Sequence, residues 1–199
     1  VVSVAAARRL CAELWMLTQP SNVVRVFWLA TDRIRRNEWT GLRAMLNEAE
    51  HDQATRFHFA EDSAAYVAAH ALLRGLLAPR LDRLPTEIRF VHGVNGKPCL
   101  NAPEPVLYFN LSHTRGMVGV ALARRCDIGI DVERVDPRRL RLDTAHRFFA
   151  PAEVEQLYAL PPERRCDAIF AFWTLNEAYI KAVGLGLAIP LDGFAFTLT

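Results

Sequence analysis

The chain has 199 residues, of which 51% are hydrophobic and 23% are charged, and its formal net charge is +2. This balance is typical of a soluble globular protein and excludes a disordered or fibrous chain. The small net charge provides no long-range basic field, so nucleic acid is not an expected partner. No apolar run approaches the roughly 20 residues of a membrane span. The four cysteines form neither a CxxC pair nor a zinc pattern, which predicts reduced thiols and a cytoplasmic location. The size predicts a monomer.

The N-terminal part predicts a strand followed by helices. Residues 1–22 are expected to be an extension, and the run VVRVFWLA from Val23 is rich in β-branched and aromatic residues, which indicates a strand. Residues 37–55 have helical spacing. The segment from Glu61 to Leu77 is rich in alanine and leucine and predicts a long, largely buried helix.

A hairpin and two strands are predicted next. Ile88–Val94 alternates as a strand and leads into Asn95-Gly96, a strong hairpin signal, so Lys97 is expected near the hairpin tip. Further strands are predicted at Leu107–Leu111 and Val118–Ala123.

The second half predicts one more strand at Asp127–Glu133, after a turn at Arg124-Arg125, and a long helix from about Arg165 to Val183. Gly184 and Gly186 end that helix. A last strand is predicted from Phe194 to Leu198.

The element order repeats. In both halves an arginine and phenylalanine precede a glutamate and a long helix. We therefore predict an α+β fold made of a pseudo-twofold pair of halves, residues 23–124 and 125–199, with C-terminal strands truncated in the second half.

The run DIGIDVE places two carboxylates together. In a strand, Asp131 and Glu133 lie on the same face, opposite Ile128, Ile130 and Val132. Such a pair suits Mg²⁺, which takes few protein oxygens and keeps water and substrate phosphates as its other ligands. A solvated acidic strand face has the same spacing and is an open alternative.

The run FWTLNEAYIK places Thr174, Glu177 and Lys181 on one stripe of a helix. Glu177 and Lys181 could form an ordinary surface pair. However, Lys97 and Lys181 are the only lysines among 24 basic residues, which indicates that these two positions need a compact ammonium group.

The run FNLSHT ends a predicted strand with Ser112 and His113, which could hold a phosphate together with backbone amides. The two side chains are adjacent and point to opposite faces, which argues against a nucleophilic pair. A capping or loop role is the alternative.

Five ordered pieces resemble the Sfp-type phosphopantetheinyl transferases: GKPCL, FNLSH, IGIDVE, RFFAPAE and FWTLNEAYIKAVGLGL. The resemblance covers Val23 to the end. It implies transfer of the 4′-phosphopantetheine arm of coenzyme A to a serine of an acyl or peptidyl carrier protein, with release of 3′,5′-ADP.

The resemblance also implies roles for individual residues. Asp131, Glu133 and Glu177 would bind Mg²⁺, and Glu177 would also accept the proton of the carrier serine. Lys181 would contact the pyrophosphate. The residues implied for the nucleotide end and its 3′-phosphate are Lys97, Ser112 and His113, and Glu153 matches a recurrent glutamate of the family.

The chain departs from the family pattern at two positions. Asn176 stands where the family carries a lysine, and Ala65 lies where an arginine is common. Both changes predict weaker contacts to phosphate and reduced activity. They leave a second function open, namely a transferase-like module that binds carrier protein or nucleotide without catalysis. A generic magnesium-dependent phosphohydrolase explains neither lysine.

Overall fold

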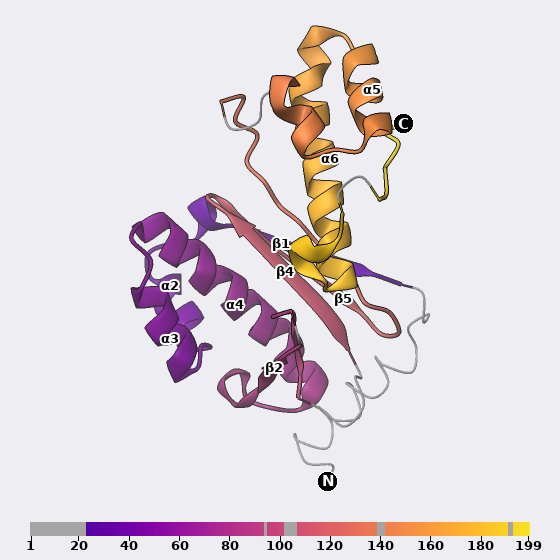
Figure 1. Cartoon of the computed structure of the whole chain (residues 1–199). Coiled ribbons are helices and arrows are strands. Elements are labelled where there is room, and N and C mark those ends of the chain that lie inside the picture. The colour runs from indigo at the N-terminus through magenta and orange to yellow at the C-terminus, as the bar shows by residue number, and fades with distance from the viewer. Residues whose placement is uncertain (1–22, 94, 102–106, 139–141, 191–192) are drawn as a thin grey trace.

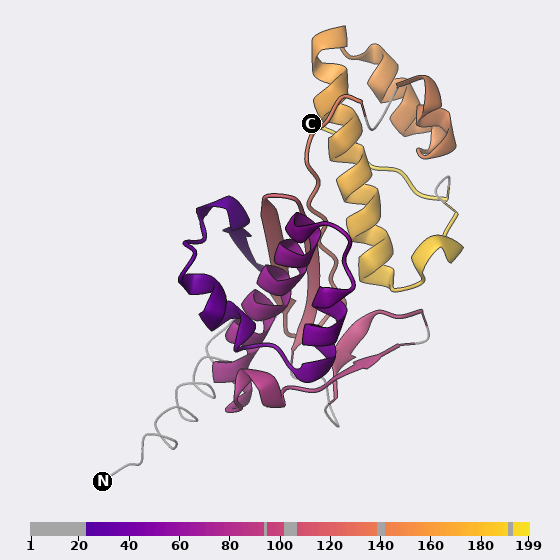
Figure 2. The same ribbon diagram turned by 90° about the vertical axis from the view of Figure 1, so that its left-hand side faces the viewer.

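The computed structural model describes residues 23–93, 95–101, 107–138, 142–190 and 193–199. It is a mixed α and β fold in which a small sheet lies between two groups of helices (Figures 1 and 2). The prediction for residues 1–22 lies outside the described residues.

The central sheet has three antiparallel strands in the order β1-β5-β4. They are β1 (Arg25–Ala30), β4 (Tyr108–Thr114) and β5 (Met117–Ala123), which confirms the three predicted strands within a few residues.

Strand β5 has large side chains on one face and small ones on the other. Val118, Val120 and Leu122 pack in the clusters on the side of helix α4 (Ala60–Leu81). The alternate positions are occupied by the small residues Gly119, Ala121 and Ala123. Because strand side chains alternate, this pattern leaves space for another segment to approach the sheet closely on the face opposite α4.

Helix α4 confirms the predicted long helix and covers one sheet face, with α2 (Glu38–Arg43) and α3 (Glu48–Thr55) on its outer side (Figure 1). Arg74 of α4 is fully buried, and its Nε and Nη2 donate to the two carboxylate oxygens of Glu50 at 2.7 and 2.9 Å. This bidentate pair fixes α3 against α4, because either charge would be costly to bury alone.

The predicted hairpin is present as β2 (Phe90–His92) and β3 (Pro98–Leu100). The Gly93 amide donates to the Lys97 carbonyl, and Gly96 has a φ of 81°, a value that glycine adopts without a steric penalty. The hairpin therefore presents Lys97 close to its turn, as predicted.

The second half contains a short helix α5 (Pro151–Ala159) and a long helix α6 (Pro162–Val183), which ends at Gly184 with a φ of 74°. Short 3₁₀ segments occur at Thr31–Arg33, Pro85–Glu87, Leu142–Arg147 and Gly186–Ala188. No helix in the described part of the chain is both long and apolar enough to cross a membrane.

The predicted strand at Phe194–Leu198 is wrong, because this segment forms no ladder with a neighbouring described strand. The Phe196 amide donates to Glu153 Oε1, and the Leu198 amide donates to Gln156 Oε1. Side chains of α5 thus satisfy backbone groups that a partner strand would otherwise bind.

Candidate active site

The predicted strand at Asp127–Glu133 is an extended segment without a regular ladder, which corrects the prediction. The Ile130 amide donates to Asn110 Oδ1 at 2.9 Å, and the Val132 amide donates to Ser112 Oγ at 3.2 Å. Side chains of β4 therefore take the place of backbone carbonyls. The two bonded amides are two residues apart, as in a strand. The side chains of the segment therefore still alternate, and Asp131 projects to the side opposite Ile130 and Val132.

Two glycines allow this segment to lie between the sheet and α6. A Cβ on Gly119 would meet side-chain carbons of Ile130 and Val132 at 3.0 Å. A Cβ on Gly129 would lie 1.8 Å from the Ala178 carbonyl oxygen, inside van der Waals contact. The close approach of Gly129 to the α6 backbone sets the position of the acidic residues relative to the lysine of that helix.

Ser112, Asp131 and Lys181 form one hydrogen-bonded cluster. Lys181 Nζ donates to Asp131 Oδ1 at 2.6 Å and to Ser112 Oγ at 3.1 Å, and Ser112 Oγ donates to Asp131 Oδ1 at 2.9 Å. The Asp131 side chain is only 6% exposed, whereas that of Lys181 is 30% exposed. Three predicted site residues from β4, the extended segment and α6 are thus brought together.

Glu177 lies one helical turn before Lys181 on α6. Burial raises the pKa of its carboxyl, the negative charge of Asp131 and, more weakly, that of Glu133 raise it further, and Lys181 partly opposes them. Glu177 therefore lies within electrostatic range of both other predicted carboxylates. Within the described ranges, however, no three His, Cys, Asp or Glu side chains form a group that could hold a metal ion.

Two observations are compatible with a divalent cation beside these residues. Asp131 Oδ2 is buried and has no hydrogen-bond partner among the described residues. Burial and the neighbouring charges of Asp131 and Glu133 raise the pKa of Glu177 against the opposing effect of Lys181, and a bound cation would compensate for both. Carboxylate oxygens with unmet charge are the ligands that Mg²⁺ prefers.

Lys97 lies beside the C-terminal end of α6. Its Nζ donates to Asp127 Oδ1 at 2.8 Å and to the Ala182 carbonyl at 2.7 Å. Lys97 and Lys181 line the same cavity of about 400 Å³. This cavity, which we call the hairpin cavity, has the following lining residues: His70, Asn95, Gly96, Lys97, Pro98, Asn110, Leu111, Glu177, Ile180, Lys181, Gly184 and Gly186.

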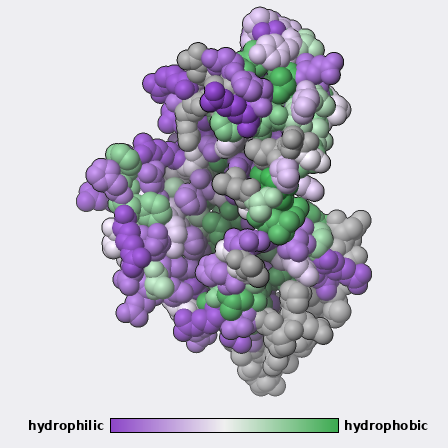
Figure 3. Space-filling model, in the orientation of Figure 1, coloured by the Kyte–Doolittle hydropathy of each residue, from purple (hydrophilic) through white to green (hydrophobic). Residues whose placement is uncertain are grey.

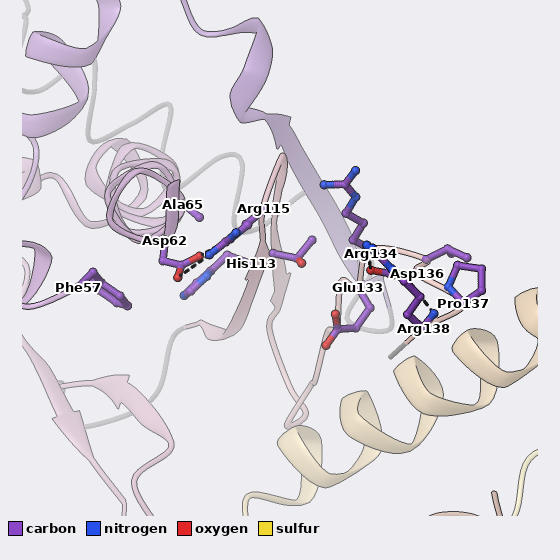
Figure 4. Close-up of a pocket in the computed structure, with 12 residues that line it drawn as sticks. Phe57, Asp62, Ala65, His113, Arg115, Glu133, Arg134, Asp136, Pro137 and Arg138 are labelled. Atoms are coloured by element: carbon purple, nitrogen blue, oxygen red, sulfur yellow. Dashed lines mark hydrogen bonds and ion pairs between the residues drawn. The ribbon is translucent and has the colours of Figure 1, made fainter. Parts of the chain in front are cut away.

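His113 points to the opposite face of β4 from Ser112, as predicted, and lines a second cavity of about 790 Å³ (Figure 4). Burial lowers the pKa of its imidazole, and the nearby His70 and Lys181 lower it further. Figure 4 shows Asp62, His113 and Arg115 on one side of this cavity and Glu133 on the other. We call it the arginine cavity, because Arg115, Arg134 and Arg138 line it.

The hollow between the α4 side and α6 is visible on the molecular surface, and hydrophobic residues lie within it (Figure 3). The two cavities therefore open beside the cluster of Ser112, Asp131 and Lys181, with Glu177 in the wall of one and Glu133 in the wall of the other.

The expectation that position 176 contacts phosphate is wrong. Asn176 is 3% exposed, and its Nδ2 donates to Glu153 Oε1 at 3.0 Å and to the Phe172 carbonyl at 2.8 Å. Ala65 is buried on α4 but does line the arginine cavity. The reduction of activity predicted from these two residues stays a prediction.

Two residues that position the site were not predicted from the sequence. Asn110 and Gly129 both lie within recognised motifs, but their contacts are with segments distant along the chain. An asparagine in the middle of an otherwise apolar strand was the available signal for Asn110, because a buried amide needs hydrogen-bond partners.

Comparisons with known proteins identify the family. Residues 127–199 match the model of the 4′-phosphopantetheinyl transferase superfamily, and residues 33–125 match the model of the N-terminal part of 4′-phosphopantetheinyl transferases. The two matched segments together contain the lining residues of the hairpin cavity and of the arginine cavity.

Three relatives are similar over most of the chain. HetI of Nostoc sp. is 35% identical over 92% of this chain and 77% of its own length. Sfp of Bacillus subtilis is 29% identical over 88% of this chain and 77% of its own length. The slr0495 protein of Synechocystis sp. is 34% identical over 76% of this chain, which spans 62% of that relative. The chain therefore belongs to the 4′-phosphopantetheinyl transferase superfamily, in its Sfp-type branch.

Proposed function

We propose that the cleft transfers the 4′-phosphopantetheine arm of coenzyme A to a serine of a carrier protein, with Mg²⁺ as the metal cofactor. The observation that carries this proposal is the cluster in which Lys181 binds Asp131 and Ser112, with Glu177 one turn away on the same helix. The Lys181 ammonium, the carboxylates of Asp131 and Glu133, and the candidate base Glu177 then lie between the two cavities.

Asp131, Glu133 and Glu177 are the residues that would hold Mg²⁺. The unpartnered Asp131 Oδ2 and the raised pKa of Glu177 support this assignment. Bound there, Mg²⁺ would neutralise charge on the pyrophosphate of coenzyme A.

Glu177 acts as the general base. It accepts the proton of the carrier serine hydroxyl while the serine oxygen attacks the β-phosphorus, and the bond to the leaving 3′,5′-ADP breaks. Its raised pKa brings the carboxylate nearer to the pH at which it works, which favours proton transfer. Lys181 supplies a positive charge beside the phosphoryl oxygens and is held in orientation by Ser112 and Asp131.

The two cavities divide the substrates. The hairpin cavity has an apolar lining at Pro98, Leu111 and Ile180, which suits the nucleotide end of coenzyme A, with Lys97 near its phosphates. The larger arginine cavity leaves room for the carrier serine to approach past Glu133. Ser112, which binds Lys181, and His113, which lines the arginine cavity, would contact phosphates of coenzyme A from the two faces of the end of β4. The free thiols of Cys99 and Cys126 are exposed, which fits a reducing cytoplasm.

Mass spectrometry of an apo carrier protein tests this function. The protein, coenzyme A and Mg²⁺ should add one phosphopantetheine to the carrier serine. Asp131→Ala and Glu133→Ala should each abolish the addition while circular dichroism shows a retained fold. Asp32→Ala, at an exposed 3₁₀ position outside both cavities, serves as the control with unchanged activity.

A chain that binds carrier protein or 3′,5′-ADP but modifies no carrier would instead be a binding module. Wild-type activity in both alanine variants would contradict the metal assignment.

A further inference from the structure

We propose, on the basis of the function above, that His70 is a specificity-determining residue whose Nε2 accepts a hydrogen bond from the exocyclic amine of the adenine of coenzyme A. His70 belongs to α4, carries no role in the chemistry described so far, and faces the hairpin cavity that also contains Lys97 and Lys181.

The hydrogen bonding of the ring fixes its tautomer. His70 Nδ1 lies 3.0 Å from the Tyr66 carbonyl oxygen. A carbonyl can only accept, so Nδ1 carries the proton and Nε2 of the neutral ring is an acceptor. Among the described residues, no hydrogen bond reaches Nε2.

The ring is also held in place and kept neutral. It stacks on the Tyr66 ring with centroids 4.0 Å apart and an interplanar angle of 32°. Burial lowers the pKa of the imidazole, the Arg74 charge lowers it further, and Glu50 and the bond to Tyr66 oppose this. A fixed acceptor in a cleft costs little conformational entropy when a donor binds.

The walls beside His70 suit a purine. Pro98 and Leu111 line both the hairpin cavity and an adjoining cavity of about 330 Å³, and His70 is the third residue that the two cavities share. Apolar groups beside a fixed acceptor match an aromatic base that carries an amine donor. The arginine cavity, in contrast, carries charged side chains of both signs, among them Asp62, Arg115 and Glu133.

Calorimetry with 3′,5′-ADP tests the inference without requiring transfer. His70→Phe keeps the ring stack but removes the acceptor and should weaken binding about three- to tenfold. His70→Gln returns an acceptor near the position of Nε2 and should recover most of the affinity. His58→Phe changes an exposed histidine outside all three cavities and should bind as the wild type does.

An analogue with purine in place of adenine identifies the donor. The wild type should bind it about three- to tenfold more weakly than 3′,5′-ADP, whereas His70→Phe should bind both ligands equally, because the two changes remove the same hydrogen bond.

Three results would overturn the inference: unchanged binding by a folded His70→Phe, equal binding of both ligands by the wild type, or discrimination by His70→Phe as strong as that of the wild type. A 2′-deoxy analogue of 3′,5′-ADP tests the ribose 2′-hydroxyl as the alternative donor. If His70→Phe loses discrimination against this analogue but keeps discrimination against the purine analogue, the assignment to the amine is overturned. A wild type that binds 3′,5′-ADP in this way but modifies no carrier refutes only the transfer function.

Discussion

Lys181 shows why one basic residue type is needed at a single position. Its Nζ reaches two acceptors within 3.1 Å, and one of them, Asp131, is almost completely buried. A compact ammonium can donate to both from a slim stem, whereas the planar guanidinium of arginine needs more room. The sequence, which uses arginine at nearly every other basic position, is consistent with this requirement.

We predict that Lys181→Arg lowers kcat/KM for coenzyme A by about 10- to 100-fold, because the charge is kept but its placement is lost. Arg43→Lys, at an exposed position of α2, should leave the rate unchanged. Steady-state kinetics on an apo carrier measure both. A fully active Lys181→Arg would show that charge alone suffices at this position.

Glu177 links charge balance to stability. Because the folded state raises its pKa, the folded protein binds this proton more tightly than the unfolded chain, and the stabilisation from the protonated form is lost as the pH rises through the folded pKa. In EDTA at pH 7, Glu177→Gln should therefore unfold at a higher temperature than the wild type. The difference should vanish by about pH 4, near the ordinary pKa of glutamate.

Added Mg²⁺ should reverse the order, since only the wild type keeps the full set of carboxylates and gains stability from the bound ion. Thermal unfolding followed by circular dichroism measures both proteins in EDTA at the two pH values and with added Mg²⁺. If the wild type is already the more stable form in EDTA at pH 7, the charge crowding inferred at Glu177 is absent.

At the scale of elements, the site depends on close contact between α6 and the extended segment after β5. Gly129 touches the α6 backbone, and Gly119 leaves space for Ile130 and Val132 on the sheet. The hydrogen bonds that β4 side chains accept from this segment then fix the position of Asp131 relative to Lys181.

Gly129→Ala should destabilise the protein by about 1–3 kcal/mol or more, because its Cβ cannot avoid the α6 backbone. Transfer activity should fall with it, as Asp131 moves away from Lys181. Gly41→Ala, in α2 with no atom within 4 Å of the added Cβ, should be neutral or slightly stabilising. Urea unfolding of both variants checks this, and equal stability of the two would mean that the segment can shift at no cost.

At the scale of the whole molecule, a fully buried carboxylate connects three parts of the second half. Glu153 accepts from the Ala150 amide at the start of α5, from Asn176 on α6 and from the Phe196 amide. Asn176 therefore stabilises the packing of α5 against α6, the helix that carries Glu177 and Lys181, and it lines none of the three cavities.

Asn176→Ala should lower the free energy of unfolding by about 1–3 kcal/mol and leave the KM for coenzyme A unchanged. The exposed Asn37→Ala, whose side chain makes no capping bond, is the matched control and should change stability little. Denaturation and kinetics together separate the two effects. A raised KM with unchanged stability would return position 176 to the phosphate site.

The sequence by itself determined the two long helices, the three strands of the sheet, the hairpin at Lys97 and the residues of the cluster. Periodicity fixes which face of a strand or helix a side chain occupies, so the separation of Ser112 from His113 and the placement of Glu177 and Lys181 on one stripe of a helix required only local rules. The ordered motifs identified the family for the same reason, since each motif is a local pattern.

Only the tertiary structure decided which faces meet. The segment at Asp127–Glu133 and the stretch at Phe194–Leu198 both have strand-like composition, yet side chains of β4 and α5 bind their amides in place of a ladder. Asn176 sits beside a catalytic candidate in sequence but turns into the core toward Glu153. Hydrogen-bond partners distant along the chain determine these outcomes, and local propensity contains no information about them.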